Sequence, residues 1–134
     1  MRSLGDLAWL NSYIGLPYEK AGRSAHGVDC YGLLCLVYEQ RHGITLPDWH
    51  HDKMKVKARS HVIESVLHGG TWTETEEPQE GGIVVAYKGR PALHLGLTFA
   101  GSVLHAFEYS GVIYEPLHRF AERYTRLEFG TWSP

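Results

Sequence analysis

The stretch His26-Gly27-Val28-Asp29-Cys30-Tyr31-Gly32-Leu33-Leu34 decides the fold, because a glycine-rich loop changes there into the clearest helix of the chain. Asp29 is a suitable N-cap, and Gly43 stands where a left-handed residue commonly ends a helix. The helix has one apolar face, formed by Leu33, Leu34, Val37 and Tyr38. The pattern predicts a helix over residues 29–42 with Cys30 in its first turn.

Cys30 is a candidate nucleophile because of its place at the start of this helix. Backbone N–H groups and the positive end of the helix dipole meet there, and both favour a thiolate. The same N–H groups can donate to an oxyanion that forms beside the sulfur. Most cysteines outside disulfides are buried packing residues, and Cys35, among apolar neighbours on the same helix, is predicted to be one of them.

The rest of the chain predicts helices first and strands afterwards. Residues 3–14 have a rough helical period, a long loop follows, and a second helix is expected over residues 58–68. From Gly81 the hydrophobic period changes to two and predicts five strands, at residues 83–87, 93–99, 103–107, 112–117 and 124–129. This order is typical of an α+β domain with an antiparallel sheet.

Two of the nine histidines lie inside predicted strands. Apolar residues alternate with His94 in one strand and with His105 in the next, so both histidines belong to the less apolar face. A tight turn at residues 100–101 would pair residues whose numbers sum to 201 and make the histidines diagonal neighbours. A turn one residue later moves them apart but keeps them on one face. With Cys30 they would supply a nucleophile, a base and a group that orients the base. The alternative interpretation is that the two histidines are half-exposed and unrelated to each other.

Length and composition narrow the classes of protein. The 134 residues suffice for one domain, residues 1–134, with one core. A net charge of −2 provides no positive field for nucleic acid or anionic lipid, so neither is an expected partner. No apolar run approaches the roughly 20 residues of a membrane span. The first ten residues lack the pattern of a signal peptide, so we expect synthesis in the cytoplasm and another route for any export.

Several motifs resemble those of the NlpC-type cell-wall cysteine peptidases, over about Gly15 to Leu117. They are Gly15-Leu16-Pro17-Tyr18, Gly22-Arg23-Ser24, Asp29-Cys30-Tyr31-Gly32-Leu33, Gly43 to Pro47, His94-Leu95-Gly96 and Leu104-His105-Ala106. The resemblance implies a papain-like fold, with N-terminal helices packed on the C-terminal sheet. The small size looks most like the stand-alone members encoded with phage tails and prophages.

The resemblance also implies the roles of individual residues. Cys30 would be the nucleophile, His94 the general base and acid, and His105 the orienting residue, while Tyr18 would bring its hydroxyl near the nucleophile. Asp29 and Tyr31, on either side of the nucleophile, are assigned to substrate binding.

The expected reaction is cleavage between D-γ-glutamyl and the diamino acid in peptidoglycan stem peptides. Expected partners are these stem peptides and phage tail-tip proteins, and the expected location is the virion tail, the periplasm or the cell wall. No cofactor is required. The chain departs from the family pattern at Tyr31, often a serine, and at Gly82, usually an aspartate.

Three alternatives compete with hydrolysis. Cysteine and histidine together can bind zinc, but two cysteines spaced as Cys30 and Cys35 on a helix point their sulfurs apart, so no metal is expected. A structural tail-tip or assembly module with the same fold, active or not, is the second. Acyl transfer to an acceptor other than water would use the same cysteine and histidine and is the third.

Overall fold

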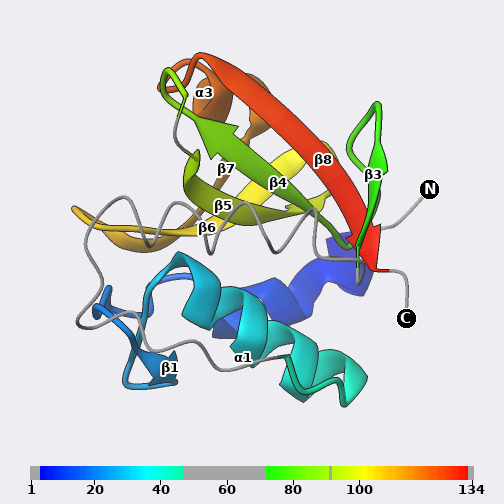
Figure 1. The fold of residues 1–134 in the computed structure, drawn as a ribbon. Coiled ribbons are helices and arrows are strands. Elements are labelled where there is room, and N and C mark those ends of the chain that lie inside the picture. The colour runs from blue at the N-terminus through cyan, green and yellow to red at the C-terminus, as the bar shows by residue number, and fades with distance from the viewer. Residues whose placement is uncertain (1–3, 47–71, 91, 133–134) are drawn as a thin grey trace.

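The computed structural model describes residues 4–46, 72–90 and 92–132. Short elements precede the main helix, and strands make up most of the described residues after it (Figure 1). The elements are η1 (Leu4–Ser12), β1 (Arg23–Ser24), β2 (Gly27–Val28), α1 (Cys30–His42), β3 (Trp72–Thr75), β4 (Gly82–Tyr87), β5 (Ala92–Phe99), β6 (Ser102–Phe107), β7 (Gly111–Pro116), α3 (Leu117–Ala121) and β8 (Arg126–Trp132). No helix in the described ranges is long and apolar enough to cross a membrane.

The main sheet has the strand order β3-β8-β4-β5-β6-β7, and all its pairs are antiparallel. Helix α1 packs against one face through β5 and β6, while α3 contacts β6 and β7 (Figure 1). The predicted α+β class is confirmed. The predicted number of five strands is wrong, because the described residues form a sheet of six, with β3 added beside β8. The last strand also starts later than predicted, because α3 and a turn follow β7 directly.

Helix α1 has the predicted ends. The Asp29 carboxylate accepts a hydrogen bond from the Gly32 N–H at 2.7 Å, which caps the N-terminus. Gly43 adopts φ 67° and ends the helix. The segment predicted as a helix over residues 3–14 is a 3-10 helix, Leu4–Ser12. The helix predicted over residues 58–68 lies outside the described residues.

The alternation of the strands divides the buried residues between the two faces of the sheet. One cluster joins α1 to the sheet through Leu33, Leu34, Val37, Ile83, Val85, Leu95, Leu97 and Leu104. The other lies on the α3 side and contains Val84, Ala86, Val103 and Phe120. Because both faces are covered, the polar side chains of β5, β6 and β7 on the α3 side lie in an enclosed setting.

The hairpin between β5 and β6 has the register that brings the two histidines together. Ala100 and Gly101 have φ of 51° and 78°, as in a two-residue turn with both central residues left-handed. Leu97 pairs with Leu104 and Phe99 with Ser102, so paired numbers sum to 201, as the first of the two predicted registers requires.

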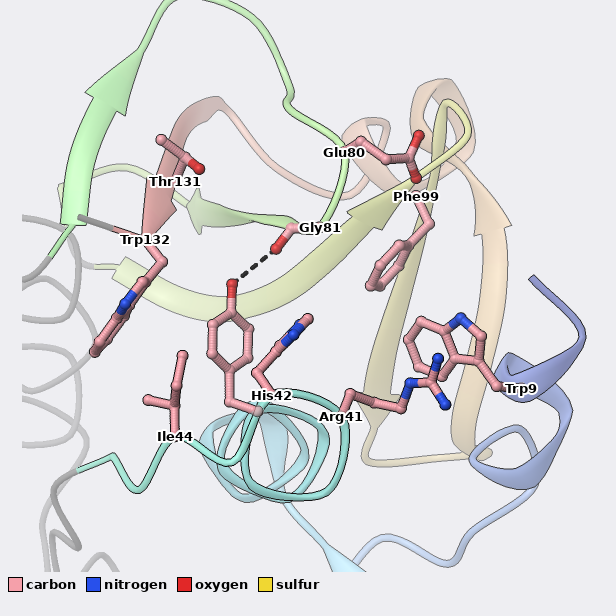
Figure 2. A pocket seen from close by; sticks show the side chains of 10 residues that line it. Trp9, Arg41, His42, Ile44, Glu80, Gly81, Phe99, Thr131 and Trp132 are labelled. Atoms are coloured by element: carbon pink, nitrogen blue, oxygen red, sulfur yellow. Dashed lines mark hydrogen bonds between the residues drawn. The ribbon is translucent and has the colours of Figure 1, made fainter. Parts of the chain in front are cut away.

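Aromatic side chains fasten the C-terminal end of α1 to the end of the sheet. The Tyr38 ring packs against Trp72 and Trp132, at centroid distances of 5.3 and 6.0 Å. Burial raises the pKa of Tyr38 to about 12, so its hydroxyl keeps its proton and donates to the Gly81 carbonyl at 2.7 Å (Figure 2). Tyr38 and Trp132, together with Trp9 and Phe99, wall a cavity of about 310 Å³ (Figure 2). The far end of α1 is therefore held in place, which fixes the helix on the sheet.

Gly32 tests the contact between the loop and the start of α1. A Cβ at this position would lie 1.8 Å from the Gly22 carbonyl oxygen, so one backbone must move. We expect Gly32→Ala to lower the free energy of unfolding by about 2–3 kcal/mol, despite the better helix propensity of alanine. Urea unfolding monitored by circular dichroism measures it. The exposed Glu39→Ala on the same helix should stay within about 0.5 kcal/mol of wild type; equal stabilities of the two variants would contradict the contact.

Candidate active site

Cys30 is the first residue of α1 and is half-buried. The preceding residue, Asp29, is buried, and its carboxylate binds three groups: the N–H of Gly32 at 2.7 Å, the N–H of Ala21 at 3.0 Å and the Arg23 guanidinium at 3.0 Å. These bonds join the loop before the helix to the helix itself. The backbone of the cysteine is therefore fixed on both sides.

A cavity of about 370 Å³ opens beside Cys30. Its lining comes from the helix start, from the beginning of β5, from the ends of β4 and β6, and from the turn after α3, and it includes Tyr18, Asp29, Cys30, Lys88, His94 and Tyr124. The strand segment at Tyr18 is positioned by a bridge to Val28, with backbone hydrogen bonds of 3.0 Å on both sides. The cavity thus brings a thiol, an imidazole and three phenols together, the last from Tyr18, Tyr109 and Tyr124.

Behind His94 lies a chain of hydrogen bonds that runs across the sheet. His94 Nε2 is 2.8 Å from His105 Nδ1, and His105 Nε2 is 2.6 Å from Glu115 Oε2. The Arg123 guanidinium donates to both oxygens of Glu115, at 2.8 and 2.9 Å. His105 is fully buried and Glu115 is 7% exposed, so water competes little for these bonds.

The environment sets the charges in this chain. Burial by itself raises the pKa of Glu115, but hydrogen bonds from Arg123 and His105, together with their charge, outweigh it, and the pKa of Glu115 is lowered. Burial lowers the pKa of His105, and this outweighs the opposing effect of Glu115. At neutral pH Glu115 is therefore an ionised carboxylate and His105 is a neutral imidazole.

The His94 ring lies nearly parallel to two aromatic rings, Phe120 at 5.9 Å and Tyr124 at 6.2 Å between centroids. Burial, and to a smaller extent the nearby Cys30, raise the pKa of Tyr124 to about 12 against the lowering effect of Arg123. The Tyr124 hydroxyl therefore stays protonated beside the sulfur. Stacking on one side and the His105 hydrogen bond at Nε2 together fix the orientation of the His94 ring.

A β-bulge in β5 lies next to His94. Ala86 of β4 pairs with His94, but the next residue, Tyr87, pairs with Ala92, so β5 has one extra residue at this point. Bulges bend a strand and redirect side chains, and they are common beside active sites. The bulge lies at the end of the sheet where His94 enters the cavity.

The structure brings most of the predicted site residues together. Cys30, His94, Tyr18 and Asp29 line one cavity, and His105 lies directly behind His94. Tyr31 does not line it: this side chain is 2% exposed, with the Arg23 guanidinium 5.3 Å from its ring centre.

The two departures from the family pattern have local structural reasons. Tyr31 packs inside the molecule, so the structure gives it a packing role and does not support contact with substrate. At Gly82, a Cβ would lie 2.4 Å from the Gly130 carbonyl oxygen, so the approach of β8 favours glycine. Cys35 is half-buried, packs against the core and borders a different, smaller cavity.

Three side chains of the candidate site were not predicted from the sequence: Glu115, Arg123 and Tyr124. Glu115 could have been noticed as a single acid in an otherwise apolar strand. In the β6–β7 register residues 103 and 115 pair, which makes Glu115 a diagonal neighbour of His105. The position of Arg123 and Tyr124 follows from α3 and its turn, which no pattern in the sequence predicted.

A cysteine at a helix start and a histidine on an antiparallel sheet, sharing one cavity, define a papain-like α+β domain. The chain belongs to the NlpC/P60 family, a family of cysteine peptidases, because the model of that family matches residues 15–128. No match was found among curated protein sequences.

Two solved structures show the same fold. The NlpC/p60 domain of the peptidoglycan hydrolase SagA superposes with a TM-score of 0.62 at 23% identity, covering 99% of this chain and 100% of that domain. An NlpC/P60 family protein from Bacillus cereus superposes with a TM-score of 0.64 at 24% identity, covering 99% of this chain. This chain spans only 41% of the length of the second protein.

The buried pair of His105 and Glu115 predicts that the folded protein loses stability in acid. The pKa of His105 in the folded protein lies below 6.5, so under about that pH the unfolded chain takes up a proton that the folded protein does not, which favours unfolding. Glu115 adds a second loss below about pH 4.5, because its folded pKa is also lowered. Each group contributes a slope of at most about 1.4 kcal/mol per pH unit.

Urea unfolding between pH 7.5 and 5 measures this slope. His105→Gln removes the titrating ring, so its stability should change less steeply below pH 6.5 than that of the wild type. Identical slopes for the two proteins in this window would show that His105 is not held neutral.

Proposed function

We propose that the protein is a cysteine peptidase that hydrolyses an amide bond in peptidoglycan stem peptides. The observation that carries the proposal is the shared cavity of Cys30 and His94, with His94 held by His105 at 2.8 Å. Membership of the NlpC/P60 family and the fold shared with a domain of a peptidoglycan hydrolase support the choice of substrate.

In the proposed mechanism, the Cys30 sulfur attacks the amide carbonyl carbon as His94 takes the thiol proton. The Cys30 N–H and the Tyr18 hydroxyl donate to the oxyanion. His94 then gives its proton to the leaving amine as the carbon–nitrogen bond breaks. In the second half, His94 removes a proton from water, the hydroxide attacks the thioester, and the thiolate leaves and is reprotonated.

His105 orients His94 in this scheme. The Nε2 atom of His94 is engaged by His105, so proton exchange with the thiol and with the leaving amine takes place at Nδ1. The stacking of His94 against Phe120 and Tyr124 holds the ring plane constant during these transfers.

We further propose that the cleaved bond joins D-γ-glutamyl to the diamino acid. The acyl side of this bond has a free α-carboxylate, and Lys88 provides a cation at the mouth of the cavity. Arg123 also lines the cavity but is already paired with Glu115. Lys88 is thus the cation of the cavity that we assign to the substrate carboxylate.

The role of Cys30 is tested with purified muropeptides and mass spectrometry of the products. Cys30→Ala should abolish hydrolysis, because no other group in the cavity can form the thioester. Cys35→Ala, on the same helix but bordering a different cavity, should retain most of it. A dead Cys35→Ala protein, or unchanged product maps with Cys30→Ala, would refute the assignment.

The role of Lys88 is tested with two substrates that differ only at the glutamyl α-carboxylate, one free and one amidated. Lys88→Gln should lower kcat/KM for the free acid by about fivefold, as expected for one exposed ionic contact, and leave the amide unchanged. Arg90→Gln, an exposed cation of the same turn outside the cavity lining, is the control. Equal losses on both substrates would show that Lys88 does not bind the carboxylate.

We also propose association with a phage tail, supported by the resemblance to small stand-alone members. Co-purification with virions would demonstrate the location. A protein that co-purifies but releases no muropeptide products would favour the assembly module, and products joined to added amines would favour acyl transfer over hydrolysis.

A further inference from the structure

The hydrogen-bonded chain behind His94 continues beyond the two histidines. It passes from β5 through β6 to Glu115 on β7 and ends at Arg123, in the turn after α3. His105 is fully buried and Glu115 nearly so, and no step of the proposed reaction uses either Glu115 or Arg123 directly.

We propose that Glu115, held by Arg123, is a positioning residue that places the ring protons of both histidines on Nε2 and leaves Nδ1 of His94 as the base. The consequence for catalysis rests on the proposed function, whereas the proton positions can be observed without any reaction.

The first step of the argument concerns Glu115. Arg123 donates to both of its oxygens, at 2.8 and 2.9 Å, and a guanidinium group has no acceptor. Glu115 is therefore an ionised, acceptor-only group. His105 Nε2, at 2.6 Å from Oε2, must carry a hydrogen and donate it.

The second step concerns the other nitrogen of His105. A buried imidazole beside a single carboxylate tends to take up a second proton, and His105 Nδ1 would then donate to His94 Nε2. His94 would be left, in its neutral form, with its hydrogen on Nδ1 and no lone pair for the thiol proton. Burial lowers the pKa of His105 most, and the positive charge of Arg123 lowers it further, so both oppose this outcome. Glu115 therefore supplies the acceptor for His105, and Arg123 supplies the charge that balances it.

The third step is that the rings cannot readily turn over to another arrangement. The edge-to-face contact of His105 with Phe120 has a centroid distance of 4.8 Å and an interplanar angle of 90°. The Arg123 guanidinium lies 5.2 Å from the centre of the Phe107 ring. Packing thus keeps Nδ1 of His105 toward His94 and Nε2 toward Glu115, and the proton positions follow.

The direct test is nitrogen-15 NMR of the histidine rings at about pH 8. It uses Cys30→Ala protein, in which no thiol can protonate His94. We expect both His94 and His105 to carry their hydrogen on Nε2. A hydrogen on Nδ1 of His94 would overturn the proposal whether or not the wild type hydrolyses muropeptides.

Two substitutions of Glu115 separate its acceptor role from its charge. Glu115→Gln can keep an oxygen at the Oε2 position, where it accepts from both His105 and Arg123, and loses only the contact to the second guanidinium nitrogen. Glu115→Leu removes the acceptor. The Nε2–H signals should persist in the first variant, and His94 should become a mixture of both tautomers in the second.

Hydrolysis by the same variants, in protein that retains Cys30, gives the catalytic consequence. We expect kcat of Glu115→Gln to fall by no more than about tenfold and kcat of Glu115→Leu by at least about 100-fold, since a wrong tautomer costs up to about 10⁴-fold in a comparable triad. KM should change little in either. Glu122→Leu, an exposed acid near the end of α3, is the control and should match the wild type.

Arg123→Met keeps the proposal testable if Glu115→Leu does not fold. The carboxylate then lacks its balancing charge, so the pKa of His105 should be higher than in the wild type. An unchanged pKa of His105 in this variant, or wild-type ring signals in a folded Glu115→Leu protein, would overturn the role assigned to the pair. A wild-type protein that hydrolyses no muropeptide but shows the expected ring signals would instead refute only the proposed function.

Discussion

The position of Cys30 at the start of α1 depends on the three hydrogen bonds that the buried Asp29 carboxylate accepts. They join a loop, a helix N-terminus and an arginine through one charged group, so the residue after it has no freedom to shift. A carboxylate bound in this way is worth more to the fold than an exposed ion pair, because little water is present to replace its partners. The thiol of Cys30 is presented from a rigid support.

The sheet provides an equally rigid support for the other half of the site. Three neighbouring strands each contribute one polar side chain, and α3 covers them, so the line from His94 to Arg123 crosses the sheet diagonally. Buried polar groups are costly unless all of them are paired, and here each donor finds an acceptor. Helix α1 and the sheet are separate layers, and the cavity lies where the two supports meet.

The sequence predicted the parts of this arrangement that depend on periodicity and capping. The helix after Asp29, the strands with His94 and His105, and the two-residue turn between them follow from local patterns. The extra residue in β5, the short strand β3 and helix α3 do not, because they depend on pairing and packing between distant segments. Glu115 could have been suspected as an acid in an apolar strand. Its partner Arg123 could not, since α3 brings it there.

The aromatic cluster at the far end of α1 has a practical consequence. Among the described residues, all three tryptophans, Trp9, Trp72 and Trp132, contact this cluster or line its cavity. Tyr38, against which Trp72 and Trp132 pack, is about 12 Å along the helix axis from Cys30, at about 1.5 Å per residue. Indole emission from these three residues therefore reports whether the helix is docked, and events at the sulfur need a different optical label.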